Sequence, residues 1–531
     1  MLFNSFDFLF IFAPVVLIVF FIVCSTGLNG IAIIWLILAS LFYYGLWNPA
    51  NICLVIGSIL FNFALGKTLS NYENIILWKR VINKKALFVF GLTSNLLLLG
   101  YYKYANFFID NVNIISGSSI HIEKIILPLA ISFFTFQQIT FLVDAYRGQT
   151  LKINFLNYCL FITFFPKLIA GPITYPREFF PQIIRRDVYK FNIENIAIGL
   201  TFFFIGLFKK VAIADNVSCY VTPVFNASEQ NTLITFTAAW VGAIAYALQI
   251  YFDFSGYSDM AIGLGRMFGI QLPLNFHSPY KSINIIDFWR RWHITLSRFL
   301  RDYIYIPLGG NRKGDIRKNI NIIITMLLGG LWHGAGWTFV LWGGLHGICL
   351  VINHMFRALR IKLGQDLNKP SLLGRGLSRA ITFIIVTIGW VLFRADSFHG
   401  AYNIIQAMVG IHGVIVPNSL LGSLNNFYGL GDLFILKVGL DVKNIPLVGI
   451  TDILIILILL LFVWFMPNTQ QFLHRTISAS EVYNLKIMPI KNKFLQFNYN
   501  IQNSMLLAII IWICLLFLAI LPKTEFIYND F

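Results

Sequence analysis

Long apolar runs recur from one end of this 531-residue chain to the other, and they constrain its fold more than any other feature. A run of roughly 18 or more residues with few charges is long enough to cross a bilayer as a helix. Hydrophobic residues make up 57% of the chain and charged residues 12%, whereas about 25% of the residues of a soluble domain are charged. The sequence therefore predicts an all-α, polytopic transmembrane protein.

We expect about 11–12 spans and additional re-entrant helices. The first apolar run has no basic region before it, so we interpret it as an uncleaved span rather than a signal peptide. The predicted spans cover residues 8–24, 31–47, 51–68, 86–108, 125–142, 195–214, 233–251, 320–337, 338–355, 379–395, 448–466 and 503–521.

Basic residues orient these spans. The formal net charge is +17, but Lys and Arg cluster in loops between apolar runs, which is the pattern of the positive-inside rule rather than of nucleic-acid binding. Lys79 and Arg80 follow the third span, which places that loop in the cytoplasm and the N-terminus outside. The most basic loop, 277–319, is also expected to be cytoplasmic, and the polar loops 215–232 and 412–447 are expected outside.

Segment 155–192 does not have the pattern of a simple span. Pro166, Gly171 and Pro172 interrupt its apolar part, and Arg185 and Arg186 follow. A helix that enters the membrane and returns to the cytoplasm accounts for both features, because such backbone is tolerated where protein or water surrounds it.

His333 is the first candidate site residue. It lies in Leu331–Gly334, within an apolar stretch that begins near Asn321. An ionisable group in a membrane segment indicates a function, and histidine is well suited to move protons near neutral pH. The alternative is a histidine that is hydrogen-bonded across a helix interface. Small residues near His333 allow either close approach of helices or a tunnel to the imidazole. These small neighbours are Gly329, Gly330, Gly334 and Gly336.

Loop 277–319 contains the second group of candidates. Trp289 and His293 are four residues apart, so on a continuous helix they share a face. Arginine is suited to bidentate phosphate contacts, and we expect such contacts from three arginines of this loop: Arg290, Arg291 and Arg298. The alternative is an amphipathic interfacial helix whose aromatic and basic residues contact lipid headgroups.

Residues 251–259 form another polar cluster at the end of an apolar run. For Asp253 and Asp259 the functional interpretation is pairing with the loop arginines or orientation of a histidine. The structural interpretation, helix capping and charge pairing, is favoured. His346 lies 13 positions after His333 and on another helix face, so we interpret it as structural.

Several kinds of chemistry have no support in the sequence. The six cysteines are scattered and form no CxxC pair, so neither a disulfide framework nor a zinc site is indicated. No Walker A loop, HExxH or GxSxG pattern is present. We therefore predict no metal site.

Three motifs together resemble the membrane-bound O-acyltransferase (MBOAT) family. They are residues 288–297 (FWRRWHITLS), 299–312 (FLRDYIYIPLGGNR) and 331–334 (LWHG). The likeness is greatest to the bacterial branch that acts on exported polysaccharide, typified by the alginate O-acetyltransferase AlgI. Residues 1–5, 165–173 and 251–259 also resemble this branch. The resemblance covers residues 1–400, so we expect a membrane core there and a C-terminal part, 401–531, with an extracytoplasmic loop and terminal helices.

The resemblance implies a helical core with a central tunnel in a bacterial inner membrane. The invariant histidine of the family corresponds to His333, and a second polar position corresponds to His293. The implied donor is acetyl-CoA, which enters from the cytoplasm and is not a permanently bound cofactor. The residues expected on the donor side are Trp289, Arg290, Arg291 and Arg298. The implied partners are a polysaccharide and an extracytoplasmic protein that accepts or transfers the acetyl group. His293 would position the acceptor, stabilise the oxyanion or carry the acyl group.

The predicted function is O-acetylation of an exported or cell-envelope polysaccharide, of the alginate type. Peptidoglycan O-acetylation and D-alanyl transfer to teichoic acid are alternatives within the same class. The alternative from another class is a transporter of lipid-linked sugars that performs no acyl transfer. Transporters often contain two repeated halves with broken helices, and the His- and Trp-rich region occurs once in this chain.

Overall fold

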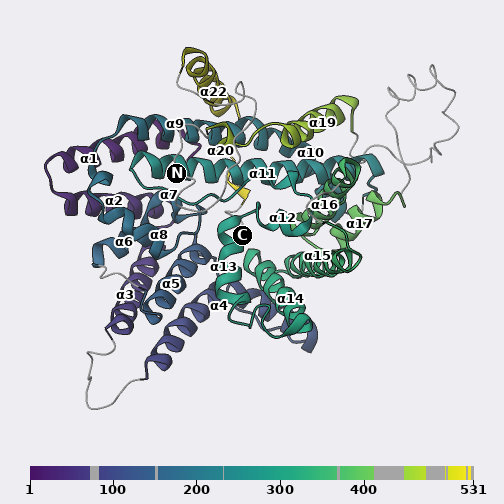
Figure 1. Ribbon diagram of the computed structural model, residues 1–531, viewed down its shortest axis with the longest axis horizontal. Coiled ribbons are helices and arrows are strands. Elements are labelled where there is room, and N and C mark those ends of the chain that lie inside the picture. Colours follow the sequence, from purple (N-terminus) through teal and green to yellow (C-terminus); the bar gives the residue numbers. More distant parts are fainter. Residues whose placement is uncertain are drawn as a thin grey trace. The chain divides into compact units, whose positions relative to one another are not determined.

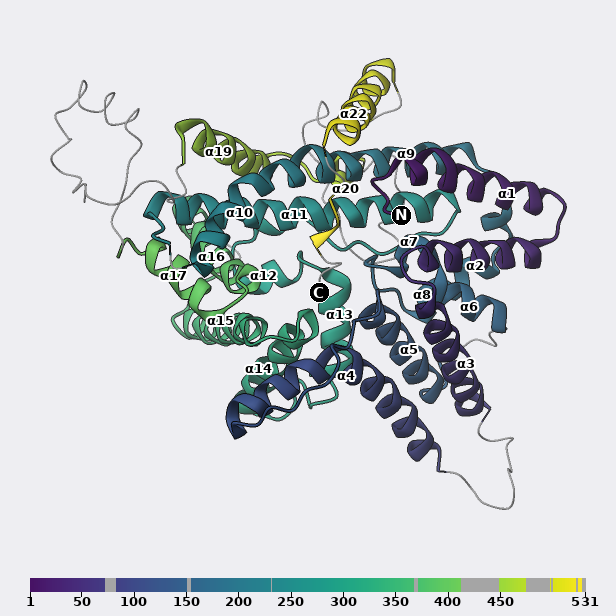
Figure 2. The same ribbon diagram turned by 180° about the vertical axis from the view of Figure 1, so that it is seen from behind.

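The computed structural model describes residues 1–71, 83–149, 154–230, 232–366, 371–411, 448–473, 497, 500–521 and 524–527. Their regular elements are helices (Figures 1 and 2). These helices form two compact units that alternate along the chain. Unit 1 comprises residues 1–208, 255–274 and 469–531, and unit 2 comprises residues 209–254 and 275–468. The proposed division near residue 400 stays a prediction.

The all-α prediction is confirmed, and a helix occupies each of the twelve predicted spans. Two of the apolar helices are short, α2 (Asn29–Gly45) and α19 (Ile450–Phe465). Within the described residues, seven helical stretches are long and apolar enough to cross a membrane: Phe8–Ser25, Ala50–Ser70, Lys84–Ser116, Ile193–Glu229, Trp337–Lys362, Leu372–Arg394 and Ile501–Ile520.

Unit 1 contains the N-terminal helices. η1 and α1 pack on α2, α3 and α4 pack on α5, and α9 packs on α22. The bounds of its elements are η1 (Phe8–Phe12), α1 (Ala13–Ser25), α2 (Asn29–Gly45), α3 (Ala50–Ser70), α4 (Lys84–Ser116), α5 (Ile131–Tyr146), α6 (Phe155–Thr163), α7 (Phe165–Leu168), α8 (Pro176–Ile184), η3 (Arg186–Tyr189), α9 (Ile193–Phe208), α20 (Thr469–Phe472) and α22 (Ile501–Ile520).

The interruptions expected in segment 155–192 are present. α6 ends at Thr163, and Phe164 leaves the helical conformation with a ψ of 106°. α7 is one turn long and carries Pro166 in its first turn, a position where proline is well tolerated. The broken backbone therefore agrees with the sequence analysis, while the re-entrant path through a bilayer stays a prediction.

Glycines bring α9 against the C-terminal part of α11 in unit 1. A Cβ added at Gly199 would lie 2.6 Å from the carbonyl oxygen of Gly263, and one added at Gly263 would lie 2.4 Å from that of Gly199. Backbone therefore touches backbone at this crossing, as small residues allow in membrane helices. The contact fixes the start of α9 beside the end of α11.

Unit 2 contains all the predicted catalytic and donor-side residues. α14 and α15 form a closely packed pair, and α16 packs on α15 (Figure 1). The elements are η4 (Lys209–Ala214), α10 (Asp215–Glu229), the first part of α11 (Phe236–Met267), η5 (Pro279–Lys281), α12 (Ile285–Trp289), α13 (Ile294–Leu300), η6 (Arg301–Tyr305), α14 (Gly314–His333), α15 (Trp337–Lys362), α16 (Leu372–Arg394), α17 (Phe398–Met408) and α19 (Ile450–Phe465).

The expectation of a polar loop at 215–232 is wrong for most of its length. Residues 215–229 form α10, which continues from η4, so residues 193–229 make one helical stretch. Asp215 begins α10, and its carboxylate pairs with Lys210 at 2.8 Å, one turn earlier in the same helical stretch. The other predicted outer loop, 412–447, lies outside the described residues.

The acidic residues of 251–259 support the structural interpretation of that cluster. Asp253 pairs with Lys210 at 2.6 Å, and both side chains are 2% exposed. In unit 1, Asp259 accepts hydrogen bonds from the Thr469 hydroxyl at 2.7 Å and from the Gln470 amide at 3.0 Å. Buried carboxylates of this kind are stabilised by their partners, so charge pairing accounts for Asp253 and hydrogen bonding accounts for Asp259.

Candidate active site

His293 lies at a break between two short helices. α12 ends at Trp289, α13 begins at Ile294, and His293 between them has a left-handed backbone with φ 40° and ψ 55°. Such a conformation is uncommon for a residue other than glycine, and it is held only where the surroundings enforce it. The prediction that Trp289 and His293 share one helix face is therefore wrong, because the helix is interrupted between them.

Asn275 holds this break in place. Its carbonyl oxygen accepts a hydrogen bond from the Ile294 N–H at 2.9 Å. Its side-chain oxygen accepts from the Thr295 hydroxyl at 2.7 Å and from the Thr295 N–H at 3.3 Å. Asn275 and His293 are both fully buried. The hydrogen bonds of one buried asparagine thus fix the start of α13, directly after His293.

His333 is the last residue of α14. The predicted span 320–337 would place His333 and the glycines on both sides of it within one helix, and this detail is wrong. Gly334 has an extended backbone, and helical structure resumes only at Trp337, so Gly334 and Gly336 belong to the turn between α14 and α15. The imidazole is nevertheless 2% exposed, as its position in an apolar stretch predicted.

Two glycines, which lack a side chain, allow α14 and α15 to pack closely. A Cβ at Gly330 would lie 2.2 Å from the carbonyl oxygen of Phe339, and a Cβ at Gly343 would lie 2.3 Å from that of Met326. Of the two alternatives, the structure thus supports close helix approach at Gly330. This contact fixes the end of α14, and therefore His333, against α15.

The fold brings the two histidines together. Their ring centroids are 6.3 Å apart, although 40 positions separate the residues in the chain. Aromatic rings surround them: Phe254 lies 4.7 Å from His293, and Trp342 and Phe393 lie 5.1 and 5.2 Å from His333. Two titratable rings thus share an apolar aromatic setting within unit 2.

Trp289 and His346 support the wall of this site. The Trp289 indole donates a hydrogen bond to His346 Nδ1 at 3.3 Å. The Trp342 ring packs between His333 and His346, and its centroid lies 5.1 Å from that of His333 and 4.8 Å from that of His346. His346 therefore packs against the same tryptophan ring as His333, in agreement with a structural role. Trp289 is buried as well, so its predicted donor-side contact stays a prediction.

The three arginines predicted on the donor side have different surroundings. Arg290 is exposed, and Arg298 is partly buried. Arg291 donates to the Asp287 carboxylate at 2.8 Å and to the carbonyl oxygen of His277 at 3.3 Å. The hydrogen bonds of Arg291 therefore stabilise the loop that contains it, and Arg290 is the arginine of the three that is most accessible to an anionic ligand.

Nearby, burial and the charges of Arg291 and Lys281 lower the pKa of His277 to about 4. Desolvation disfavours the charged imidazolium, and adjacent cations act in the same direction. His277 is therefore neutral at pH 7 beside a basic loop.

Sequence reasoning missed four residues that shape the site. They come from separate segments, and their residue types are common in any membrane core, so nothing marked them as site residues: Phe254, Asn275, Trp342 and Phe393. Two signals were usable. Phe254 lies in segment 251–259, which resembles the family branch, and Asn275 is a polar residue in an apolar context 18 positions before His293.

The arrangement suits proton transfer at a hydroxyl group. A buried imidazole can accept a proton from an alcohol, and a second imidazole nearby can hold the acceptor or donate to a developing oxyanion. Among the described residues, no group of three His, Cys, Asp or Glu side chains is placed to hold a metal ion.

Comparisons with known proteins agree with this chemistry. Residues 144–385 match the model of the membrane-bound O-acyltransferase family. The chain is 42% identical over 440 residues to the peptidoglycan O-acetyltransferase of Helicobacter pylori, an alignment that covers 78% of this chain and 81% of that protein. It is 39% identical to the probable alginate O-acetylase AlgI of Pseudomonas aeruginosa, which covers 77% and 75% of the two chains. The teichoic acid D-alanyltransferase of Bacillus subtilis is more distant, with 28% identity over 52% of this chain and 71% of that protein.

These similarities confirm the resemblance seen in the motifs, and the matched region contains both His293 and His333. Together with the apolar helices, they make the chain a multi-pass membrane protein and an O-acyltransferase. The chain belongs to the membrane-bound O-acyltransferase family.

Proposed function

We propose that this protein moves an acetyl group from acetyl-CoA in the cytoplasm to a hydroxyl group of a cell-envelope or exported polysaccharide, and that it does so in the bacterial inner membrane. The observation that carries the proposal is the pair of buried histidines, His293 and His333, with ring centroids 6.3 Å apart. Two relatives named as O-acetyltransferase and O-acetylase support the acetyl group as the transferred unit.

In the proposed reaction, His333 acts as the general base. Its imidazole takes the proton of the acceptor hydroxyl while the oxygen attacks the thioester carbonyl carbon. The new C–O bond forms, the C–S bond breaks, and the thiolate of CoA leaves and takes up a proton. A positioned base contributes about 10²–10⁴-fold to the rate, and holding both reactants in a dry site supplies the rest.

His293 is the second proposed participant. Its left-handed backbone and its hydrogen-bonded neighbours hold the ring in one place, which favours roles that need fixed geometry. Positioning of the acceptor and stabilisation of the oxyanion are such roles. Transient attachment of the acyl group is the third alternative, and it would show as a covalent intermediate.

The donor side is proposed to include Arg290, Arg291, Arg298 and Trp289. The exposed Arg290 guanidinium suits a phosphate of CoA, because arginine binds phosphate through paired hydrogen bonds. An extracytoplasmic partner protein would receive the acetyl group or present the polysaccharide to it.

We propose alginate-type polysaccharide as the acceptor class, and peptidoglycan as a second candidate. Identity to the peptidoglycan O-acetyltransferase is 42%, and identity to the probable alginate O-acetylase is 39%. Alginate-type polysaccharide and peptidoglycan both bear sugar hydroxyl groups. D-alanyl transfer is less favoured, because identity to that relative is 28% over about half of this chain.

Proteoliposomes with labelled acetyl-CoA test the proposal. Mannuronate oligomers and peptidoglycan fragments would serve as separate acceptors. We expect His333→Ala to lower transfer by about 10²–10⁴-fold and His293→Asn to lower it while keeping the fold, because asparagine tolerates a left-handed backbone. The control is His121→Ala, at an exposed histidine.

Two outcomes would overturn the assignment. Unchanged transfer by His333→Ala would remove the histidine from catalysis. Movement of a lipid-linked sugar by the wild type without consumption of acetyl-CoA would favour the transporter alternative.

A further inference from the structure

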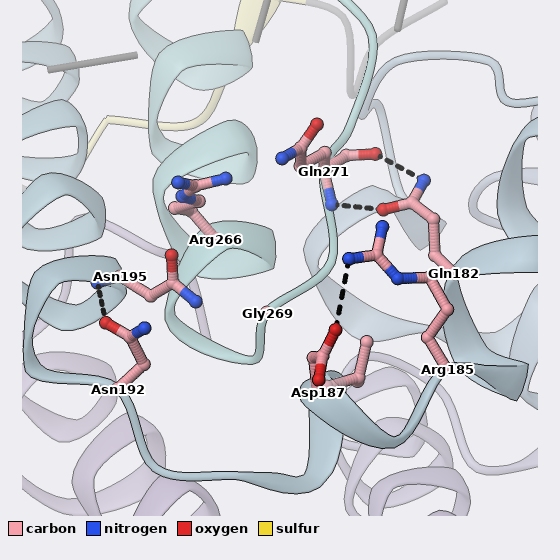
Figure 3. Close-up of a pocket in the computed structure, with 9 residues that line it drawn as sticks. Gln182, Arg185, Asp187, Asn192, Asn195, Arg266, Gly269 and Gln271 are labelled. Carbon is pink, nitrogen blue, oxygen red and sulfur yellow. Dashed lines mark hydrogen bonds and ion pairs between the residues drawn. The ribbon is translucent and has the colours of Figure 1, made fainter. Parts of the chain in front are cut away.

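Unit 1 contains a cavity of about 350 Å³ that the acyl-transfer reaction does not use. It lies between the end of α8, the start of α9 and the end of α11 (Figure 3). Polar side chains dominate its lining, among them Gln182, Arg185, Asp187, Asn195, Arg266 and Gln271. A partly open polar cavity of this size in an otherwise apolar protein is a candidate ligand site.

The frame of the cavity is built by specific contacts. Gln182 and Gln271 join its two sides: the Gln271 N–H donates to Gln182 Oε1 at 2.7 Å, and Gln182 Nε2 donates to the Gln271 carbonyl at 3.1 Å (Figure 3). Gly269 has a φ of +74°, and a Cβ there would lie 3.2 Å from Val188 Cα. Glycine therefore allows the turn after α11 to pass against η3.

The charge of the lining is positive. Arg185 and Arg266 contribute two guanidinium groups, and Asp187 contributes one carboxylate. Arg185 pairs with Asp187 at 3.2 Å, but the two side chains are 67% and 72% exposed, so the pair is weak and can be exchanged for another anion. The side-chain amide of Asn195 and the positive end of α9, which begins at Ile193, add further donors and positive potential.

Apolar side chains are exposed next to the cavity in the chain. Ile184, Phe191 and Ile193 are 56%, 63% and 71% exposed. Exposed aliphatic and aromatic groups beside basic residues are typical of a protein surface at the boundary between headgroups and acyl chains. The positive-inside rule places this basic segment at the cytoplasmic face.

We propose that this cavity binds a phosphate ester through Arg185, Arg266 and Asn195, and that the phosphate belongs to the headgroup of an anionic phospholipid. The exposed apolar neighbours favour a lipid over a soluble ligand, because they would contact its acyl chains. A phosphate of CoA has the same binding chemistry and is the other source that the experiment must distinguish. The inference goes beyond acyl transfer and does not depend on it.

The test uses two variants with opposite expected effects, on the full chain in nanodiscs. Arg266→Gln removes a positive charge from the lining, and loss of a charge-assisted hydrogen bond weakens binding roughly tenfold or more. Asp187→Asn removes the competing carboxylate, so it should strengthen binding several-fold by releasing Arg185. Misfolding cannot explain a gain in affinity. Arg375→Gln, at an exposed arginine of α16, controls for nonspecific charge effects.

Two probes identify the source of the phosphate. Retention of phosphatidylglycerol by protein in mixed phosphatidylcholine nanodiscs is measured by native mass spectrometry, and binding of CoA in pure phosphatidylcholine nanodiscs is measured by equilibrium dialysis. We expect opposite changes of phosphatidylglycerol retention in the two variants and unchanged CoA binding. Changes in CoA binding alone would overturn the lipid assignment and leave a phosphate site. If neither probe responds differently from Arg375→Gln, the cavity is not a phosphate site, whether or not acetyl transfer is intact.

Discussion

Gly343→Ala tests whether backbone contact between α14 and α15 positions the catalytic candidates. A Cβ at residue 343 would lie 2.3 Å from the Met326 carbonyl oxygen and 3.2 Å from Leu327 Cα. Side-chain Cβ atoms essentially never approach closer than 3.0 Å, so the helices must separate by at least 3.0 − 2.3 = 0.7 Å. Since both obstacles are backbone atoms, no side-chain rotation can relieve them.

The expected magnitude follows from two opposing effects. Overpacking of a tight interface costs about 1–3 kcal/mol, and replacing glycine by alanine in a helix returns about 1 kcal/mol. We therefore expect Gly343→Ala to lose up to about 2 kcal/mol of stability. Activity should fall more steeply, because Trp342 next to it packs 5.1 Å from His333, and displacements near 1 Å in a site lower rates up to about 10²-fold.

Gly344→Ala is the matched control. Its Cβ would meet only the Leu327 side chain, at 3.5 Å, so the helix preference of alanine should dominate and stability should stay equal or rise by up to about 1 kcal/mol. Thermal unfolding in detergent and acetyl transfer in proteoliposomes would be measured for both variants. Equal stability and equal activity of the two variants would refute the idea that the contact between these helices is tight enough to position His333.

Three further predictions concern buried polar groups. Lys210→Met leaves the Asp215 and Asp253 carboxylates without their shared cation, so stability should fall by about 3–5 kcal/mol in thermal unfolding, and a wild-type melting temperature would contradict this. The pKa of His277 falls from 6.5 to about 4 on folding, so below pH 6.5 the unfolded protein binds a proton that the folded protein does not. The free energy of unfolding is therefore higher above pH 6.5 and falls as the pH drops toward 4, by at most about 3 kcal/mol. His277→Gln should flatten the acid dependence of unfolding between those pH values, and an unchanged profile would assign it to other groups. Asn275→Ala removes the side-chain acceptor of Thr295, so it should lower acetyl transfer more than protein yield, whereas proportional losses would indicate a purely structural role.

The sequence predicted the helical spans well, because the length of an apolar run is a local property. It also identified both histidines, since His333 stands out in an apolar stretch and the motif around His293 resembles a family. It failed where tertiary contacts decide the backbone: the break at His293 depends on Asn275, 18 positions earlier in the chain. A helical pattern extended through residues 289–293 cannot show that interruption.

The loop at 215–232 was mispredicted for a related reason. Its polar residues indicated a surface loop, but Asp215 forms an ion pair with Lys210 across the start of α10. Phe254, Trp342 and Phe393 were missed because aromatic residues are frequent along the whole chain, which has 16% of them. Only the fold selects the few rings that contact the two histidines.

The tight contact between α14 and α15 has a consequence for biogenesis. The two helices, Gly314–His333 and Trp337–Lys362, are joined by only three residues, and basic residues lie near both outer ends. Neither helix exposes its glycine-lined face once the other is present, so we expect them to enter the membrane as one hairpin rather than one after the other. In a ribosome-bound chain truncated inside α15, α14 would then not insert stably into the membrane. His333 would take its final position only after residues well beyond it have been synthesised.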